Sequence, residues 1–145
     1  MKLIAHRGNI SEINPELENS PEYVTHALER GFDVEVDVWL LGEDWYLGHD
    51  TPDYKVTLEF IKNNKLWCHA KNLNALQSML KYNIHCFWHQ EDDYTITSRG
   101  IIWTYPGKPT TQRSVIVAKS ESTTLQLFNE NIYGICSDYV GLVKR

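Results

Sequence analysis

Two short polar stretches near the start of the chain carry the residue types of a metal-assisted acid–base site. His6 and Arg7 end the apolar run LIAHRG, and Glu35 and Asp37 alternate with valines in DVEVDV. Because side chains alternate along a strand, Glu35 and Asp37 would share one face. Two adjacent carboxylates repel each other, and a divalent cation is the simplest way to keep both ionised. The alternative is a half-exposed strand with a solvated acidic face, and the pattern alone does not separate the two.

His49 supplies a second imidazole. It follows Gly48 in DWYLGHD, residues 44–50, which we predict to be the return arm of a hairpin beside the strand of Asp37. Imidazoles titrate near neutral pH, so His6 and His49 can act as general acid and base in one turnover. The planar guanidinium of Arg7 suits a phosphate, and Gly8 would let the backbone approach a ligand closely. Metal-assisted phosphoryl transfer is the chemistry that this set predicts.

These residues need strands and helices to position them, and the chain alternates between short apolar runs and amphipathic segments. We predict strands at residues 3–7, 33–39, 44–50, 65–71, 84–90, 100–106, 114–119 and 132–138. We predict helices at residues 21–30, 57–63, 72–83 and 122–131. The first helix begins with a Ser20 cap and Pro21, and it ends before Gly31.

The order of these elements predicts an α/β fold with a parallel sheet. The predicted strands begin apolar and end polar, and the carboxyl ends of parallel strands lie together on one face. We therefore expect a single domain over residues 1–145, a compact TIM-type (β/α) barrel. Since such barrels usually need about 250 residues, its crossover helices would be reduced or missing. Exposed strand surface would then favour a homo-oligomer.

Composition excludes several classes of protein. The formal net charge is −5 and no run of basic residues is present, so we expect no nucleic-acid partner. No apolar stretch reaches 18 residues, so we expect no membrane span. Cys68, Cys86 and Cys136 lack metal-site spacing and lie in apolar runs, which predicts buried thiols in a cytoplasmic protein rather than a cysteine zinc site.

Four motifs together resemble the N-terminal signature of the glycerophosphodiester phosphodiesterase family. They are AHRG, LENS, GFDVEVDV and LGHD, in the family's order and at similar spacing, and ICSDY at residues 135–139 is similar to the end of the family's last strand. The resemblance implies a phosphodiesterase that uses a divalent cation, often Mg or Ca. It implies that His6 and His49 are the acid–base pair, that Glu35 and Asp37 bind the metal, and that Arg7 binds phosphate. In the family a substrate hydroxyl attacks phosphorus, and water opens the resulting cyclic phosphate.

The sequence departs from the family pattern at the third metal ligand. In WCHAK, Lys71 matches the family lysine and is a predicted phosphate contact, but His69 stands where the family has a carboxylate. Imidazole favours Mn or Zn over Mg or Ca, so either the metal differs or Glu121 or a water fills the position. Glu18 of LENS is a further predicted substrate-binding residue. Trp103 would stack on the substrate, with core packing as the alternative.

The predicted substrate is a small-molecule phosphodiester, glycerophosphodiester-like or a related alcohol phosphate. One alternative function is a non-catalytic phosphate- or metal-binding relative. A glycosidase is a second alternative, and the spacing argues against it. Carboxylates two residues apart on one strand have Cα atoms about 6.6 Å apart and point the same way, so Glu35 and Asp37 would not flank a glycosidic bond.

Overall fold

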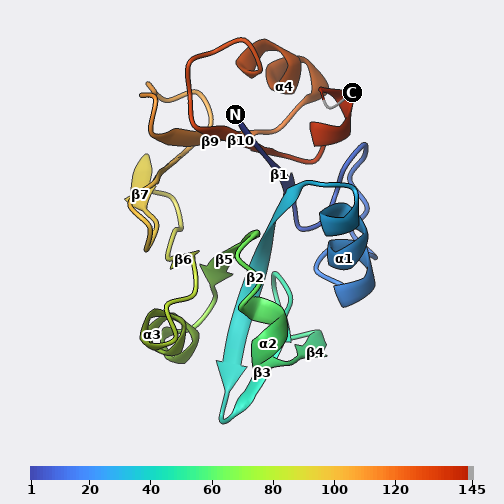
Figure 1. Ribbon diagram of the computed structural model, residues 1–145, viewed down its shortest axis with the longest axis vertical. Helices are drawn as coiled ribbons and strands as arrows, with labels where there is room; N and C mark the ends of the chain where they lie inside the picture. The colour runs from blue at the N-terminus through green and yellow to red at the C-terminus, as the bar shows by residue number, and fades with distance from the viewer. Residues whose placement is uncertain (144–145) are drawn as a thin grey trace.

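The computed structural model describes residues 1–143 as a curled mixed sheet with short helices on its outer side (Figure 1). The strands are β1 (Lys2–His6), β2 (Asp33–Leu41), β3 (Asp44–Leu47), β4 (Tyr54–Val56), β5 (Leu66–Ala70), β6 (Cys86–Phe87), β7 (Tyr94–Ile96), β8 (Ile102–Thr104), β9 (Ser114–Ala118) and β10 (Gly134–Ser137). The helices are α1 (Pro21–Glu29), α2 (Leu58–Ile61), α3 (Leu73–Lys81), α4 (Glu121–Leu127) and the 3-10 helix η1 (Val140–Leu142).

The centre of the sheet is parallel, and antiparallel strands extend it. Neighbouring strands run parallel along the order β6-β5-β2-β1-β10-β9-β8. β3 pairs antiparallel with the far end of β2, β4 pairs antiparallel with β3, and β7 pairs antiparallel with β8. All strands of the parallel part therefore end on the same face of the molecule.

The TIM-type barrel expected from the sequence is wrong: the sheet is mixed and open. No strand ladder joins β6 to β8 within residues 1–143; the Ser98 N–H reaches the Cys86 carbonyl at 2.8 Å instead. The connection from β6 to β8 holds the strand β7, and the one from β8 to β9 is a loop, so neither supplies a helix. The chain is too short to place a helix after every strand, which is why regular βα alternation fails.

The predicted elements lie close to the observed ones, with three exceptions. The strand predicted at residues 84–90 shrinks to Cys86–Phe87, and β4 and β7 were not predicted. Both missed strands have only three residues and contain charged or polar positions. They are therefore too short to show the apolar alternation by which strands are predicted. All four predicted helices are present, and Ser20, Thr57 and Asn72 cap the first three through their side chains.

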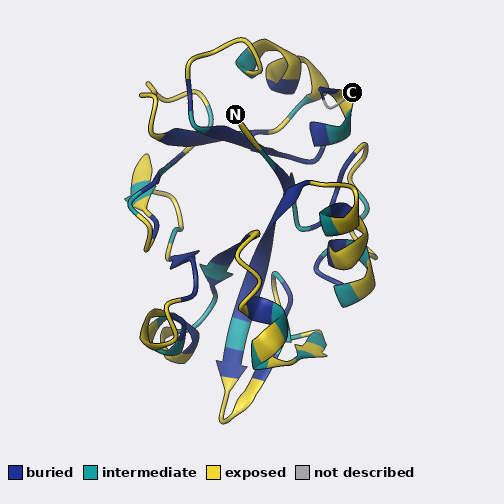
Figure 2. Ribbon diagram, in the orientation of Figure 1, coloured by how far each residue is buried: buried dark blue, intermediate teal, exposed yellow. Residues whose placement is uncertain are grey.

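Most residues of the central strands are buried (Figure 2), and apolar clusters pack on both sides of the sheet. One cluster lies between the sheet and helices α1 to α3 and includes Val24, Val36 and Met79. A second cluster fills the inside of the curl with aromatic rings, among them Phe87 and Trp103, whose rings stack at 4.5 Å. The predicted burial of the three cysteines is confirmed. Aromatic rings thus fill the interior that a closed barrel would fill with aliphatic layers.

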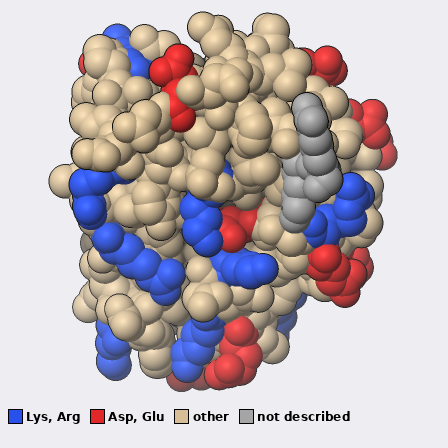
Figure 3. Space-filling view, turned by 45° about the horizontal axis from the view of Figure 1, so that its top comes forward, with Lys and Arg blue, Asp and Glu red and all other residues tan. Residues whose placement is uncertain are grey.

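The surface is mixed in charge. Lys and Arg side chains gather around a small acidic patch near the centre of the face in Figure 3. Within residues 1–143, no helix has the length and apolar character needed to cross a membrane.

The β2–β3 hairpin sets the position of the segment that carries His49. Gly42 lies in the turn with φ +62°, and a Cβ there would meet nothing within 4 Å. Gly48 ends the hairpin, and a Cβ there would lie 1.8 Å from the Thr51 carbonyl oxygen. Its N–H donates to the Asp37 carbonyl at 3.1 Å, and its own carbonyl accepts from the Trp39 indole at 2.7 Å.

Alanine substitutions at the two glycines should therefore differ in cost. Gly42→Ala meets only the strain of a positive φ and should lower the free energy of unfolding by about 1 kcal/mol. Gly48→Ala must displace backbone and should cost about 3 kcal/mol. Urea denaturation of both variants measures the difference, and equal costs would contradict the close approach at Gly48.

Candidate metal and phosphate site

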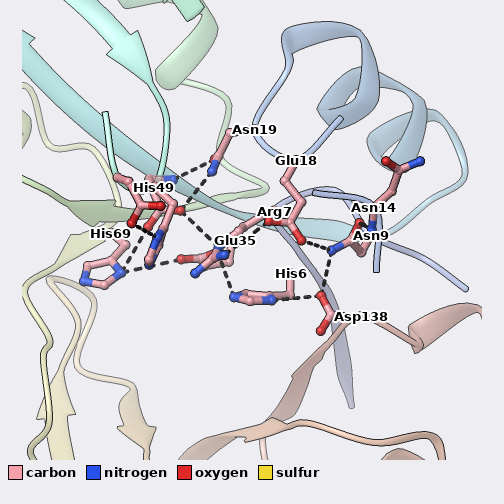
Figure 4. A network of polar contacts seen from close by, with 12 residues as sticks. His6, Arg7, Asn9, Asn14, Glu18, Asn19, Glu35, His49, His69 and Asp138 are labelled. Atoms are coloured by element: carbon pink, nitrogen blue, oxygen red, sulfur yellow. Dashed lines mark hydrogen bonds and ion pairs between the residues drawn. The ribbon is translucent and has the colours of Figure 1, made fainter. Parts of the chain in front are cut away.

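Strand register brings the predicted residues together at the carboxyl ends of the parallel strands. His6 of β1 is paired with Glu35 of β2, and Asp37 of β2 is paired with His69 of β5. Asp138 follows β10, the other neighbour of β1. Figure 4 shows these side chains as one polar network. Four adjacent strands therefore build the site, and the open edge of the sheet is not part of it.

The two carboxylates of β2 are buried, so the solvated acidic face considered above is wrong. Glu35 is 3% exposed and Asp37 is fully buried. Oε1 of Glu35 and Oδ1 of Asp37 have no hydrogen-bond partner among the described residues. Unpaired carboxylate oxygens in a low-dielectric interior are costly, which points to a cation or a charged ligand.

His69 faces both carboxylates. Its Nδ1 lies 3.6 Å from Oε2 of Glu35 and 3.4 Å from Oδ1 of Asp37. Its Nε2 lies 2.7 Å from the His89 carbonyl and can bond it only as a donor, and Phe87 stacks on the ring at 5.0 Å. Burial alone would lower the His69 pKa, but bonds to the two carboxylates outweigh it and raise the pKa to about 9. Without a metal, His69 is therefore a cation at neutral pH.

One candidate metal site is present among the described residues, and it consists of Glu35, Asp37 and His69. One ligand atom from each lies within 4.8 Å of the others. The unpartnered carboxylate oxygens and the Nδ1 that faces them fit a divalent cation, which would take the place of the His69 proton. This arrangement agrees with the predicted ligand set, and Glu121 is exposed at the start of α4, outside the cluster.

Arg7 and Asn19 hold Asp37 from the other side. Nε of Arg7 lies 3.3 Å from Oδ2 of Asp37, and the Asn19 amide donates to the same oxygen at 2.9 Å. The Asp37 N–H in turn donates to the Asn19 side-chain oxygen at 3.0 Å. Burial would raise the Asp37 pKa, but the close His69 imidazole and the Arg7 charge lower it to about 2. Asp37 is therefore ionised at all physiological pH values.

Asp138 orients His6. The His6 Nδ1 lies 2.9 Å from Oδ1 of Asp138, and the Asn9 amide donates to the same oxygen at 2.8 Å. The His6 Nε2 faces Oε1 of Glu35 at 4.0 Å. Burial would lower the His6 pKa, but the Asp138 bond and the Glu35 charge raise it overall. Since Asp138 occupies Nδ1, Nε2 is the ring nitrogen of His6 that is left for proton transfer.

A strained turn after β1 places Arg7. Arg7 and Asn19 have positive φ angles of 55° and 65°, which side chains adopt at a cost of about 1 kcal/mol or more. The Asn19 N–H donates to the Arg7 carbonyl at 3.0 Å and closes the turn. Gly8 has φ +92°, and a Cβ there would lie 2.8 Å from the Tyr23 ring. The backbone at Gly8 is therefore approached closely by the Tyr23 ring, whereas the sequence predicted a close approach to a ligand.

His49 lies near the network without bonding to it. Its Nδ1 contacts Oδ1 of Asp50 at 2.8 Å, and its side chain is 42% exposed. In the view of Figure 4, His6 and His49 lie on either side of Glu35 and Arg7. Within residues 1–143 no hydrogen bond or ion pair joins the His49 ring to either β2 carboxylate.

The predicted substrate contacts have different surroundings. Glu18 accepts from Arg7 Nη1 at 3.2 Å and from the Asn9 amide at 2.9 Å, so it supports Arg7 directly. Lys71 follows β5, half-buried, with its N–H bonded to the Val38 carbonyl at 2.8 Å. Trp103 is 4% exposed within the aromatic cluster. It therefore packs in the core, which was the alternative to stacking on the substrate.

Sequence reasoning missed two asparagines. Asn9 is buried and bonds Glu18 and Asp138, and it accepts from the Tyr23 hydroxyl at 3.0 Å; Asn19 is buried against Asp37. Asn9 follows HRG directly and Asn19 lies within LENS, so both are in the motifs already singled out. Each of these side-chain amides bonds two groups of the network. These bonds depend on contacts between segments that are far apart in the sequence.

Neither the scan of protein-family models nor the search among curated proteins finds a match for this chain. The resemblance to the glycerophosphodiester phosphodiesterases therefore stays a prediction, and the functional conclusion rests on the geometry of the site.

The raised pKa of His69 predicts how stability depends on pH in the metal-free protein. Folding favours the protonated ring, so its contribution is complete below the unfolded pKa of 6.5 and is lost as the pH rises through about 9. In EDTA, the free energy of unfolding should fall by about 3 kcal/mol across this window.

The variant His69→Gln isolates the contribution of the His69 ring, because the glutamine side chain does not titrate between pH 6.5 and about 9. Urea denaturation at a series of pH values measures the slope for both proteins. A variant that keeps the full slope of the wild type would show that His69 does not carry it.

Proposed function

We propose that this protein is a metal-dependent phosphodiesterase that cleaves a small glycerophosphodiester-like or related alcohol phosphate. One observation carries the proposal. One buried carboxylate oxygen of Glu35 and one of Asp37 lack hydrogen-bond partners and face the His6 and His69 imidazoles, respectively, while Arg7 lies directly beside Asp37. A divalent cation next to a guanidinium and an imidazole suits a phosphate ester better than an uncharged substrate.

Glu35, Asp37 and His69 would hold the metal. A bound divalent cation would neutralise phosphate charge and polarise the phosphorus–oxygen bonds. The ligand set of two carboxylates and one imidazole favours Mn or Zn over Mg or Ca, since the last two prefer oxygen ligands. The nitrogen ligand is therefore the feature that decides which metal the protein selects.

Arg7 is placed to hold the phosphate. Its Nε and Nη1 contact Asp37 and Glu18, which fixes the plane of the guanidinium and leaves Nη2 for a phosphate oxygen. Lys71, two residues beyond His69, would add a second positive charge at the same end of the sheet. Both cations balance a site that is otherwise strongly acidic.

His6 and His49 would move the protons. Asp138 occupies Nδ1 of His6, so Nε2 accepts or donates the transferred proton. An attacking oxygen, from a substrate hydroxyl or water, gives its proton to one imidazole as its bond to phosphorus forms. The other imidazole protonates the departing alkoxide as the old phosphorus–oxygen bond breaks. Acid and base exchange roles if a cyclic phosphate is then hydrolysed.

A non-catalytic metal- or phosphate-binding protein is the second candidate. The unpartnered carboxylate oxygens and the 42% exposed His49, which has no bond to the carboxylates, fit metal binding without turnover. A protein that only binds a metal or phosphate has no need of the Asp138 contact that fixes the His6 ring. The phosphodiesterase therefore accounts for more of the site than the non-catalytic protein does.

Removal of His6 should separate these functions. With bis(p-nitrophenyl) phosphate and Mn or Zn, His6→Ala should lower kcat by about 100-fold to 10,000-fold, because proton transfer is lost. His26→Ala, an exposed histidine of α1, is the matched control and should keep wild-type activity. Release of p-nitrophenolate measures both, and unchanged turnover in His6→Ala would contradict the acid–base role.

Removal of a metal ligand tests the site directly. Glu35→Gln should weaken binding of Mn and Zn by roughly 10-fold to 100-fold or more in calorimetric titration. Glu59→Gln, an exposed glutamate of α2, should bind like the wild type. Metal binding without hydrolysis in the wild type would favour the non-catalytic function. Tighter binding of Mg or Ca than of Mn would contradict ligation by His69.

A further inference from the structure

A second pocket lies at the opposite ends of the parallel strands from the site described above. It has a volume of about 370 Å³, within the usual range for small-molecule pockets. Lys2 begins β1, Asp33 begins β2, and Lys65 and Tyr133 directly precede β5 and β10, so these residues mark the amino ends of the sheet. His6, Glu35 and Asp37 lie further along the same strands.

The floor of this pocket is built from buried side chains. Trp67 is 2%, His85 4%, Ile101 7% and Asp33 7% exposed. The Trp67 indole donates to Oδ2 of Asp33 at 2.9 Å, and Lys2 Nζ lies 3.5 Å from the same oxygen. The one carboxylate that lines the pocket is therefore already neutralised by residues of its own wall.

The rim of the pocket is cationic. Lys65 and Arg99 are exposed beside Lys2, and neither Lys65 nor Arg99 forms an ion pair within residues 1–143. The one side-chain hydrogen bond of Arg99 goes from Nη1 to the Asn64 carbonyl at 3.4 Å, which is long. With three cations against one carboxylate, the lining has an excess of two positive charges, and most guanidinium donors of Arg99 have no partner among residues 1–143.

His85 adds a neutral donor to the floor. The Thr97 hydroxyl oxygen already accepts from the backbone N–H groups of Arg99 and Ile101, both at 3.3 Å. Its single hydrogen is therefore donated to Nε2 of His85, 2.8 Å away. The ring proton of the neutral imidazole must then lie on Nδ1, which has no hydrogen-bond partner in the described part of the chain. Burial and the Arg99 charge lower the His85 pKa to about 4, so the ring stays neutral at physiological pH.

We infer that this pocket binds a small organic phosphate monoester, with its dianionic phosphate between Arg99, Lys65 and Lys2 and its organic part over Ile101 and Tyr133. The guanidinium fork suits phosphate oxygens, and the His85 N–H supplies an uncharged hydrogen bond from the floor. The half-buried ring of Tyr133 and the edge of Ile101 give the organic part an apolar surface. This inference does not depend on the proposed phosphodiesterase activity.

Calorimetric titration with phenyl phosphate in EDTA tests the inference, because EDTA removes any metal that could hold phosphate at the other site. The wild type should bind one equivalent, more tightly than it binds inorganic phosphate or phenol. Arg99→Gln and Lys65→Gln should each weaken binding by about 10-fold or more, since each removes a charged contact.

Two control variants locate the binding. Lys81→Gln removes an exposed lysine of α3, and Lys71→Gln removes the lysine next to the metal site; both should bind like the wild type. The histidine ring NMR signal of His85 Nδ1–H should shift on titration. Absence of saturable binding, equal weakening in Lys81→Gln, or loss in Lys71→Gln with Arg99→Gln unaffected would each overturn the inference.

Discussion

The burial of two carboxylates side by side on β2 is the constraint on which the site depends. Removing each charge from water costs several kcal/mol, and their mutual repulsion adds to this cost. Arg7 and Asn19 offset it for Asp37, and His69 offsets it for both groups as a cation. Oε1 of Glu35 and Oδ1 of Asp37 nevertheless have no hydrogen-bond partner among the described residues, and their nearest cationic neighbours are the His6 and His69 rings at 4.0 and 3.4 Å. In the proposed function, a divalent cation would bind these two oxygens in place of the His69 proton.

An open sheet is sufficient for this site because the contributing strands are neighbours. The order β5-β2-β1-β10 carries His69, the carboxylate pair, His6 and Asp138 in sequence across the sheet. The contacts in the cluster are made between adjacent strands, by the segment between β1 and α1, and by the loop after β6. Closure between β6 and β8 would add nothing to these contacts, so a short chain can build the site without helices in the later crossovers.

The two ends of the parallel strands gather different charged groups. The carboxyl ends gather Glu18, Glu35, Asp37 and Asp138 around a single arginine, whereas the amino ends gather Lys2, Lys65 and Arg99 around the neutralised Asp33. Trp67 and His69 lie two residues apart on β5, so one strand contributes to both ends. Aromatic packing of Trp67, Phe87 and Trp103 fills the space between the two ends and keeps them separate.

The sequence alone determined which β2 side chains share a face and where the apolar strands end. Alternation in DVEVDV put Glu35 and Asp37 on one face, and the polar ends of the apolar runs indicated strand ends, because side-chain direction follows from strand geometry alone. Only the tertiary structure decided that this face is buried, that Asn9 and Asn19 complete the network, and that the sheet stays open. Burial and amide bonding depend on which segments pack together across long separations, such as Asp138 with His6. Closure of the sheet into a barrel depends on the lengths of all the crossover connections together, so no single motif can predict it.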